Sequence, residues 1–71
     1  MKGYAIGPAP LTPRMRDVLR AAAAGSTVTQ TARELGVSDA TVCSVRAAAC
    51  ERLGVRGVTA AVARAYARGE L

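Results

Sequence analysis

The stretch of sequence that decides the fold is ARELGVSDATV, residues 32–42. Gly36 is positioned to end a helix, because glycine reaches the left-handed backbone conformation without a Cβ clash. Val37 follows as a turn residue that can reach the core, and Ser38 is a good N-cap for a second helix. Asp39 then places a negative charge at the positive N-terminal end of that second helix. The stretch therefore predicts two helices joined by a tight turn.

The two helices around this turn are predicted at about 28–35 and about 39–52, with Thr27 capping the first and Gly54 closing the second. The first has three apolar residues at helical spacing on its buried edge, namely Val28, Ala32 and Leu35. The second has a buried line made of Val42, Val45, Ala49 and Leu53. At 100° per residue, its opposite face carries Ala40, Ser44, Ala47, Ala48 and Glu51.

One further helix is predicted on each side of this pair. The earlier helix begins with Thr12 as N-cap and Pro13 at its first position, and Gly25 stops it. Its apolar stripe repeats every three or four residues and consists of Met15, Val18, Leu19, Ala22 and Ala23. After a loop at 54–58, Thr59 is expected to cap a helix of about 60–68. The fold class predicted is all-α, with four helices.

The chain of 71 residues is long enough for one small domain. Residues 1–10 are rich in Gly and Pro and have no hydrophobic period, so they are predicted to form a flexible N-terminal arm. The remainder, 11–71, is predicted to be a single helix-turn-helix domain. Hydrophobic residues make up 51%, but many are alanines and there is no Phe or Trp, so we expect modest stability or stabilisation by a partner subunit.

The net charge of +5, carried mostly by arginine, favours an anionic partner such as a phosphate backbone. The alternative is that arginine only keeps an alanine-rich chain in solution. No histidine is present and the five acidic residues are scattered, so nothing indicates an enzyme. No cofactor, metal or small-molecule ligand is expected either.

The two cysteines, Cys43 and Cys50, lie two turns apart on one predicted helix, with Cα atoms about 10.5 Å from each other. A disulfide needs less than about 7 Å, so they are not expected to pair. We interpret them as small apolar residues in a reducing cytoplasm. No apolar run approaches the length of a membrane span, and the opening residues lead into no signal peptide.

In this arrangement the sequence resembles the LuxR/GerE (NarL/FixJ) DNA-binding domain. The matching segments run without gaps from Leu11 to about Val62 and are LTPRMRDVL (11–19), Gly25, ARELGVSDATV (32–42) and RLGV (52–55). The resemblance implies a scaffold helix, a helix-turn-helix pair and a fourth helix that often forms a homodimer. It also implies a regulator of transcription, here small and stand-alone, that inserts its third helix into the major groove of duplex DNA. A chain of this size would suit an actinobacterial or phage-encoded regulator.

The chain departs from the family at positions that carry function. The family usually has a basic residue where this chain has Cys43, and often a histidine where it has Val45. A further frequent DNA contact falls on Ala47, and Thr31 replaces a residue that is usually apolar. The positions expected to face bases are Cys43, Ser44 and Ala47, and none can make a bidentate pair with guanine or adenine.

The other candidate site residues are expected near phosphates or at a dimer interface. Helix N-termini bind phosphates, which points to Thr27, Ser38 and Thr41. The arginines that are candidates for phosphate contacts are Arg14, Arg16, Arg20 and Arg33. Arg46 is also a candidate, although its helical angle places it nearer the core than the groove. The predicted dimer face of the fourth helix is Val58, Ala61, Val62, Ala65 and Tyr66.

A second hypothesis uses the same fold for a different partner. The small neutral residues Ala40, Ser44, Ala47 and Ala48 would let another backbone approach closely. The chain would then be a protein-interaction module that binds another regulator or part of the transcription machinery. A third hypothesis is a DNA-binding subunit of a larger machine. Fold alone does not decide among them.

Overall fold

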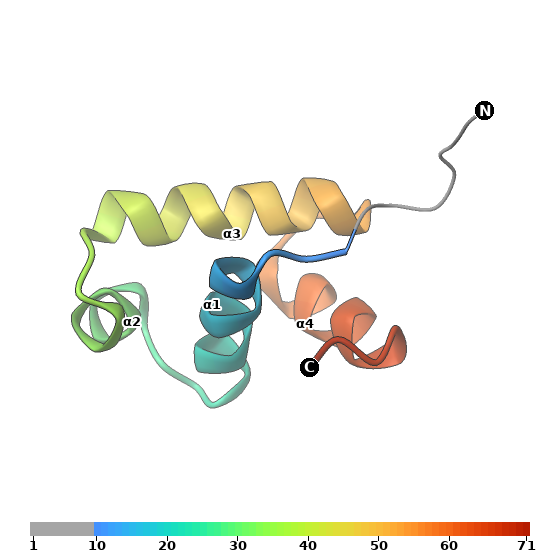
Figure 1. Cartoon of the computed structure of the whole chain (residues 1–71), viewed down its shortest axis with the longest axis horizontal. Helices are drawn as coiled ribbons and strands as arrows, with labels where there is room; N and C mark the ends of the chain where they lie inside the picture. Colours follow the sequence, from blue (N-terminus) through green and yellow to red (C-terminus); the bar gives the residue numbers. More distant parts are fainter. Residues whose placement is uncertain (1–9) are drawn as a thin grey trace.

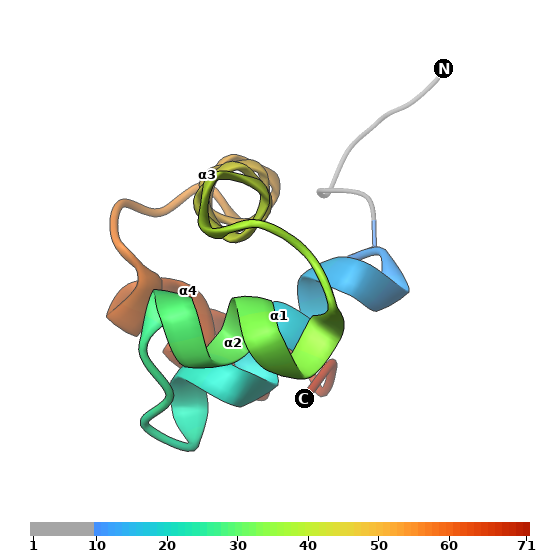
Figure 2. The same ribbon diagram turned by 90° about the vertical axis from the view of Figure 1, so that its left-hand side faces the viewer.

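The computed structural model describes residues 10–71, which form four helices and no strand. The helices are α1 (Pro13–Ala23), α2 (Val28–Leu35), α3 (Asp39–Leu53) and α4 (Val58–Ala67). The longest, α3, runs across the other three (Figure 1). Figure 2, which looks along α3, shows it above the layer formed by α1, α2 and α4. The all-α prediction is confirmed.

The predicted caps and stops of the first helix are confirmed. The Oγ1 atom of Thr12 accepts a hydrogen bond from the backbone N–H of Met15 at 3.1 Å, and Pro13 occupies the first turn. The helix ends before Gly25, whose φ of 92° is reached at little cost only by glycine. These local signals set the ends of α1, because Thr12 and the Gly25 N–H satisfy backbone groups that the helix leaves free, and Pro13 has no N–H to leave unpaired.

The start of α4 corrects the sequence prediction. Thr59 does not cap this helix, because the helix already begins at Val58, with Gly57 at the N-cap position and no side-chain cap. Gly57 has a φ of 84°, and Val58 packs against the main core cluster. Burial of Val58 therefore draws the chain into the helix before Thr59 is reached.

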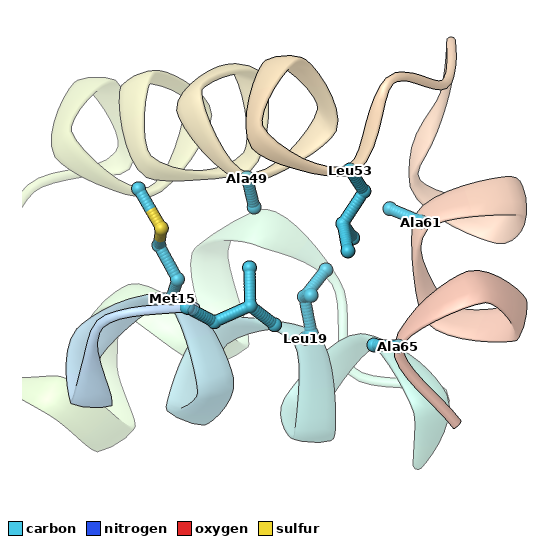
Figure 3. Close-up of a cluster of buried hydrophobic side chains, with 7 residues drawn as sticks. Met15, Leu19, Ala49, Leu53, Ala61 and Ala65 are labelled. Carbon is cyan, nitrogen blue, oxygen red and sulfur yellow. The ribbon is translucent and has the colours of Figure 1, made fainter. Parts of the chain in front are cut away.

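The core consists of two clusters that share α1 and α3. The main cluster lies between α1, α3 and α4 (Figure 3), and its buried members are Leu11, Met15, Leu19, Ala49, Leu53, Ala61 and Ala65. The smaller cluster joins α1, α2 and α3 through Val18, Ala32 and Val42. Val45 is half-buried and packs against both clusters. Most of the predicted buried positions are confirmed.

Two alanines were predicted on the wrong side of their helices. Ala23, expected in the stripe of α1, is exposed, and Ala48, expected on the outer face of α3, is half-buried against the main cluster. Ala48 packs against the cluster that contains Leu11, and the Nη1 atom of Arg52, one turn further along α3, donates to the carbonyl of Pro10 at 2.7 Å. Hydropathy gave no warning, since the two faces of α3 are almost equally apolar.

Charged side chains hold the start of the domain at Pro10 and Leu11. The backbone N–H of Leu11 donates to Oε1 of Glu70 at 2.8 Å, and its carbonyl accepts from Nη1 of Arg16 at 2.7 Å. Because Arg52 binds the Pro10 carbonyl, position 10 is attached to α3 rather than part of a free arm. The rest of the predicted arm, residues 1–9, lies outside the described residues.

Thr31 offers a test of the smaller cluster. Its side chain is 0% exposed, and its hydroxyl donates to the Thr27 carbonyl at 2.9 Å, which also accepts the Thr31 N–H. Thr31→Val removes a buried hydroxyl without leaving that carbonyl unpaired. We expect it to stabilise the fold by about 0.5–1 kcal/mol, which raises Tm by roughly 2–8 °C. Thr59→Val, at an exposed position, should leave Tm nearly unchanged, and a lower Tm for Thr31→Val would contradict the prediction.

Candidate nucleic-acid interface

The segment from α2 to α3 forms a helix-turn-helix. Gly36 adopts the left-handed conformation with φ 71° and ends α2, as predicted. The backbone N–H of Val37 then donates to the Ala32 carbonyl at 3.0 Å, and the Val37 side chain packs against the smaller cluster. Ser38 caps α3 by accepting from the Thr41 N–H at 3.1 Å. Three turn residues are thus enough to set α3 against α2.

The outer face of α3 is free of the other helices (Figures 1 and 2). The three positions expected to face bases, Cys43, Ser44 and Ala47, are all exposed. Ala40 and Glu51 are exposed as well, whereas Ala48 is not part of this surface. We call the set Ala40, Cys43, Ser44, Ala47 and Glu51 the reading face. It carries no basic residue.

The N-terminal ends of α2 and α3 lie next to each other. The hydroxyl of Thr29 in the first turn of α2 donates to Oδ2 of Asp39, the first residue of α3, at 2.8 Å. Thr27 caps α2 in a capping box with Gln30, and Ser38 caps α3. Helix N-termini carry free N–H groups and a positive partial charge. Two such ends therefore share one side of the domain, close to the start of the reading face.

The capping hydroxyls are engaged but exposed. The Oγ atoms of Ser38 and Thr41 lie 3.0 Å apart and share a hydrogen bond. Gln30 returns the capping bond of Thr27, since its Oε1 accepts the Thr27 N–H at 2.8 Å. All of these residues are on the surface. The remaining N–H groups of each first turn are thus the ones available to an anion.

The candidate arginines do not gather at one place. Arg14 and Arg33 are exposed, on α1 and α2. Arg16 is half-buried and donates a hydrogen bond to the Leu11 carbonyl. The Nη1 atom of Arg20 lies 3.9 Å from Oδ1 of Asp17. Arg46 is half-buried, and its Nε atom is buried with no hydrogen-bond partner among the described residues. Its position agrees with the helical angle, so Arg46 lies at the flank of α3 rather than on the reading face.

The residues predicted for a dimer interface differ in how far they are exposed. Ala61 and Ala65 are 0% exposed and belong to the domain's own core, so they have no surface to offer a partner. Val58 and Val62 are half-buried and line a pocket of about 240 Å³ together with Ala22, Ala23 and Thr59. Tyr66 is 57% exposed, which makes it the large hydrophobic residue that α4 presents to solvent.

Two features of this site were missed from the sequence. The spacing of Thr27 and Gln30 is the signature of a capping box and was readable. The bond between Thr29 and Asp39 was not, because it joins residues ten apart and depends on the angle of the turn. Asp39 was recognised only for its charge at the end of a helix.

Nothing in the described part of the chain indicates other chemistry. Cys43 is exposed, Cys50 is half-buried, and both thiols are free. No group of three or more His, Cys, Asp or Glu side chains that could hold a metal ion is found in residues 10–71. Within the same range, no helix is both long and apolar enough to cross a membrane.

Four helices with this turn, a capped third helix and a free outer face define a helix-turn-helix DNA-binding domain. The chain matches the GerE family model, which describes bacterial regulatory proteins of the luxR family, over residues 9–65, and it belongs to that family. Domains of this family are DNA-binding regulators and not enzymes. A search of the curated proteins finds no match to the chain.

The N-cap of α3 can be tested with two matched substitutions. Ser38→Ala removes the hydroxyl that accepts from the Thr41 N–H, and we expect it to destabilise the domain by about 1 kcal/mol. Ser44→Ala makes the same chemical change at an exposed position in the middle of α3, where alanine is the better helix former, so stability should stay within about 0.5 kcal/mol. Urea unfolding of the two variants measures both, and equal effects would contradict the assigned cap.

Proposed function

We propose that this domain regulates transcription by placing α3 in the major groove of duplex DNA, with the N-terminal ends of α2 and α3 against the phosphates. The observation that carries the proposal is the adjacency of these two helix ends to a free outer face of α3, in a member of the luxR family. An α-helix fits the major groove, and the preceding helix braces it on the backbone. The two helix ends and the outer face of α3 are therefore enough by themselves to support DNA binding.

The proposed base contacts are few and weak. Ser44 supplies one hydroxyl, Cys43 a weak donor, and Ala47 a methyl that suits the methyl group of thymine. Glu51 on the same face is negative, which disfavours phosphates nearby. We infer a modest preference for sequence, with most of the affinity supplied by contacts to phosphates.

The proposed phosphate contacts come from both helix ends and from arginines. Thr27, Ser38 and Thr41 lie at the capped ends, where backbone N–H groups can donate to a phosphate. Arg14 and Arg33 are exposed and supply charge, while Arg46 would reach the backbone only from the flank of α3. Arg16 is a poorer candidate than the sequence suggested, because it already binds the Leu11 carbonyl.

The central test is binding to mixed duplex DNA by fluorescence anisotropy at 0.05 M and 0.2 M salt. Four to six phosphate contacts predict a loss of affinity of about 10²- to 10³-fold across that range. Ala47→Lys adds a cation to the reading face, so it should tighten binding about tenfold at 0.05 M salt and steepen the salt dependence by about 0.9 in the log–log slope.

The matched control is Ala67→Lys, which adds the same charge at an exposed position on α4. It should leave the affinity for DNA and the slope of the salt dependence nearly unchanged, because α4 does not belong to the proposed DNA interface. If the two lysine variants gain equally, then charge alone governs binding and the reading face is not in the groove. Absence of binding by the wild-type domain at 0.05 M salt would reject the DNA proposal.

One observation favours the second candidate function, a protein-interaction module. The reading face carries no basic residue, and its small side chains Ala40, Ser44 and Ala47 allow close approach of another backbone. A protein partner on this face is the interpretation that would follow if the wild-type domain did not bind DNA.

We also propose that two copies associate through α4, which would place two α3 helices about one DNA turn apart. Val58, Val62 and Tyr66 are spaced four residues apart and so lie along one side of α4. In a twofold antiparallel contact centred on Val62, Tyr66 of each copy faces Val58 of the other. The pocket beside Val58 is smaller than the roughly 300–1,000 Å³ typical of ligand pockets, and suits a single side chain.

Tyr66→Arg tests this association without disturbing the core, since Tyr66 is exposed. We expect the wild-type domain to sediment as a concentration-dependent dimer and Tyr66→Arg as a monomer, because an arginine charge buried against Val58 of the other copy would be unpaired. Ala67→Lys serves again as the control for added charge and should still dimerise. A wild-type monomer, or a dimer that survives Tyr66→Arg, would reject this interface.

A further inference from the structure

The hydrogen bond between Thr29 and Asp39 crosses the helix-turn-helix at its exposed end. The Thr29 hydroxyl donates to Oδ2 of Asp39 at 2.8 Å. Within residues 10–71 it is the one side-chain hydrogen bond that joins α2 to α3. Both residues sit in the first turn of their helices, Thr29 two residues after the cap Thr27 and Asp39 directly after the cap Ser38. The bond therefore fixes the two helix ends and not the helices' packed middles.

Apolar packing at this end of the pair is limited to two half-buried valines, Val28 at the first position of α2 and Val37 in the turn before α3. The smaller cluster holds α2 and α3 together through Ala32 and Val42, each about one turn further along its helix. Before those positions, the first turn of α3 is wholly exposed, as are Thr29 and Gln30 of α2. Because these two valines are only partly buried, packing holds this end of the pair less firmly than the part around Ala32 and Val42.

The chemistry of the pair shows how it would act on DNA binding. Thr29 has a single hydroxyl proton, and that proton is given to Asp39, so Thr29 has none to donate to a phosphate. Asp39 is negative and would repel a phosphate rather than bind one. Placed between two positive helix ends, its charge offsets their mutual repulsion. The pair is therefore suited to holding the helix ends and not to touching the nucleic acid.

We propose that Thr29 and Asp39 are positioning residues for DNA binding, which set the spacing of the N-terminal ends of α2 and α3 so that both meet the phosphate backbone. This rests on the proposed function. Phosphates are spaced regularly along the duplex, so two donor groups engage them together only when their separation is fixed in advance. The pair supplies that preorganisation where apolar packing is only partial.

The experiment is a double-mutant cycle on DNA affinity with Thr29→Val, Asp39→Ala and the double variant. Thr29→Val conserves shape and net charge and breaks only the bond. We expect it to weaken binding about three- to tenfold, the range of one hydrogen bond, with an unchanged salt slope because no cation is lost. In the Asp39→Ala background the same substitution should have no effect. Thr29→Ser keeps the hydroxyl and should restore wild-type affinity.

Each outcome decides the proposal. Loss of affinity by Thr29→Val only when Asp39 is present supports it, provided the thermal unfolding of Thr29→Val resembles that of the wild type. An equal loss with and without Asp39 overturns it, because Thr29 would then touch DNA itself. Unchanged affinity of Thr29→Val also overturns it, while leaving DNA binding intact. If the wild-type domain binds no DNA at 0.05 M salt, the proposed function fails first and this inference with it.

Discussion

The whole arrangement depends on two neighbouring residues of α1. Val18 and Leu19 are both fully buried, yet they belong to different clusters, because adjacent positions on a helix point about 100° apart. Val18 faces α2 and the first half of α3, whereas Leu19 faces α4 and the second half of α3. One helix thus separates the core into two parts and supports α3 along most of its length. Val45, in contact with both clusters, joins the two parts.

This division leaves α3 with an inner line that packs and an outer face that does not. Its fully buried residues are Val42, Ala49 and Leu53, and the half-buried Val45 lies between them along the same line. The outer face is therefore free to change without cost to the core, and in this chain its side chains are mostly small and include no cation. Val45 stands where the family often has a histidine, and in this chain that position contributes to the packing of both clusters.

The features that the sequence predicted correctly are those that depend on residues close together in the chain. Caps at Thr12, Thr27 and Ser38 and stops at Gly25 and Gly36 follow from backbone groups that a helix end must satisfy, so they could be read without knowing the tertiary structure. Alanine limited the rest. Because alanine occurs readily on either face of a helix, the side on which Ala23 or Ala48 lies depends on neighbours distant in sequence. The Thr29–Asp39 bond and the start of α4 at Val58 were not predicted, because they too depend on tertiary contacts.

The composition of the core and that of the reading face have a common consequence. A core built largely from alanine, valine and leucine buries little apolar area per residue, so the domain would gain stability from burying more surface against a partner. A reading face without cations contributes little to affinity for DNA, so binding must draw on the helix ends and on the phosphates. Association through α4 would serve both needs, because doubling the number of phosphate contacts raises affinity while the buried surface of Tyr66 and Val62 stabilises the fold. In this chain, recognition is therefore expected to depend more on the spacing of two domains than on the side chains of one helix.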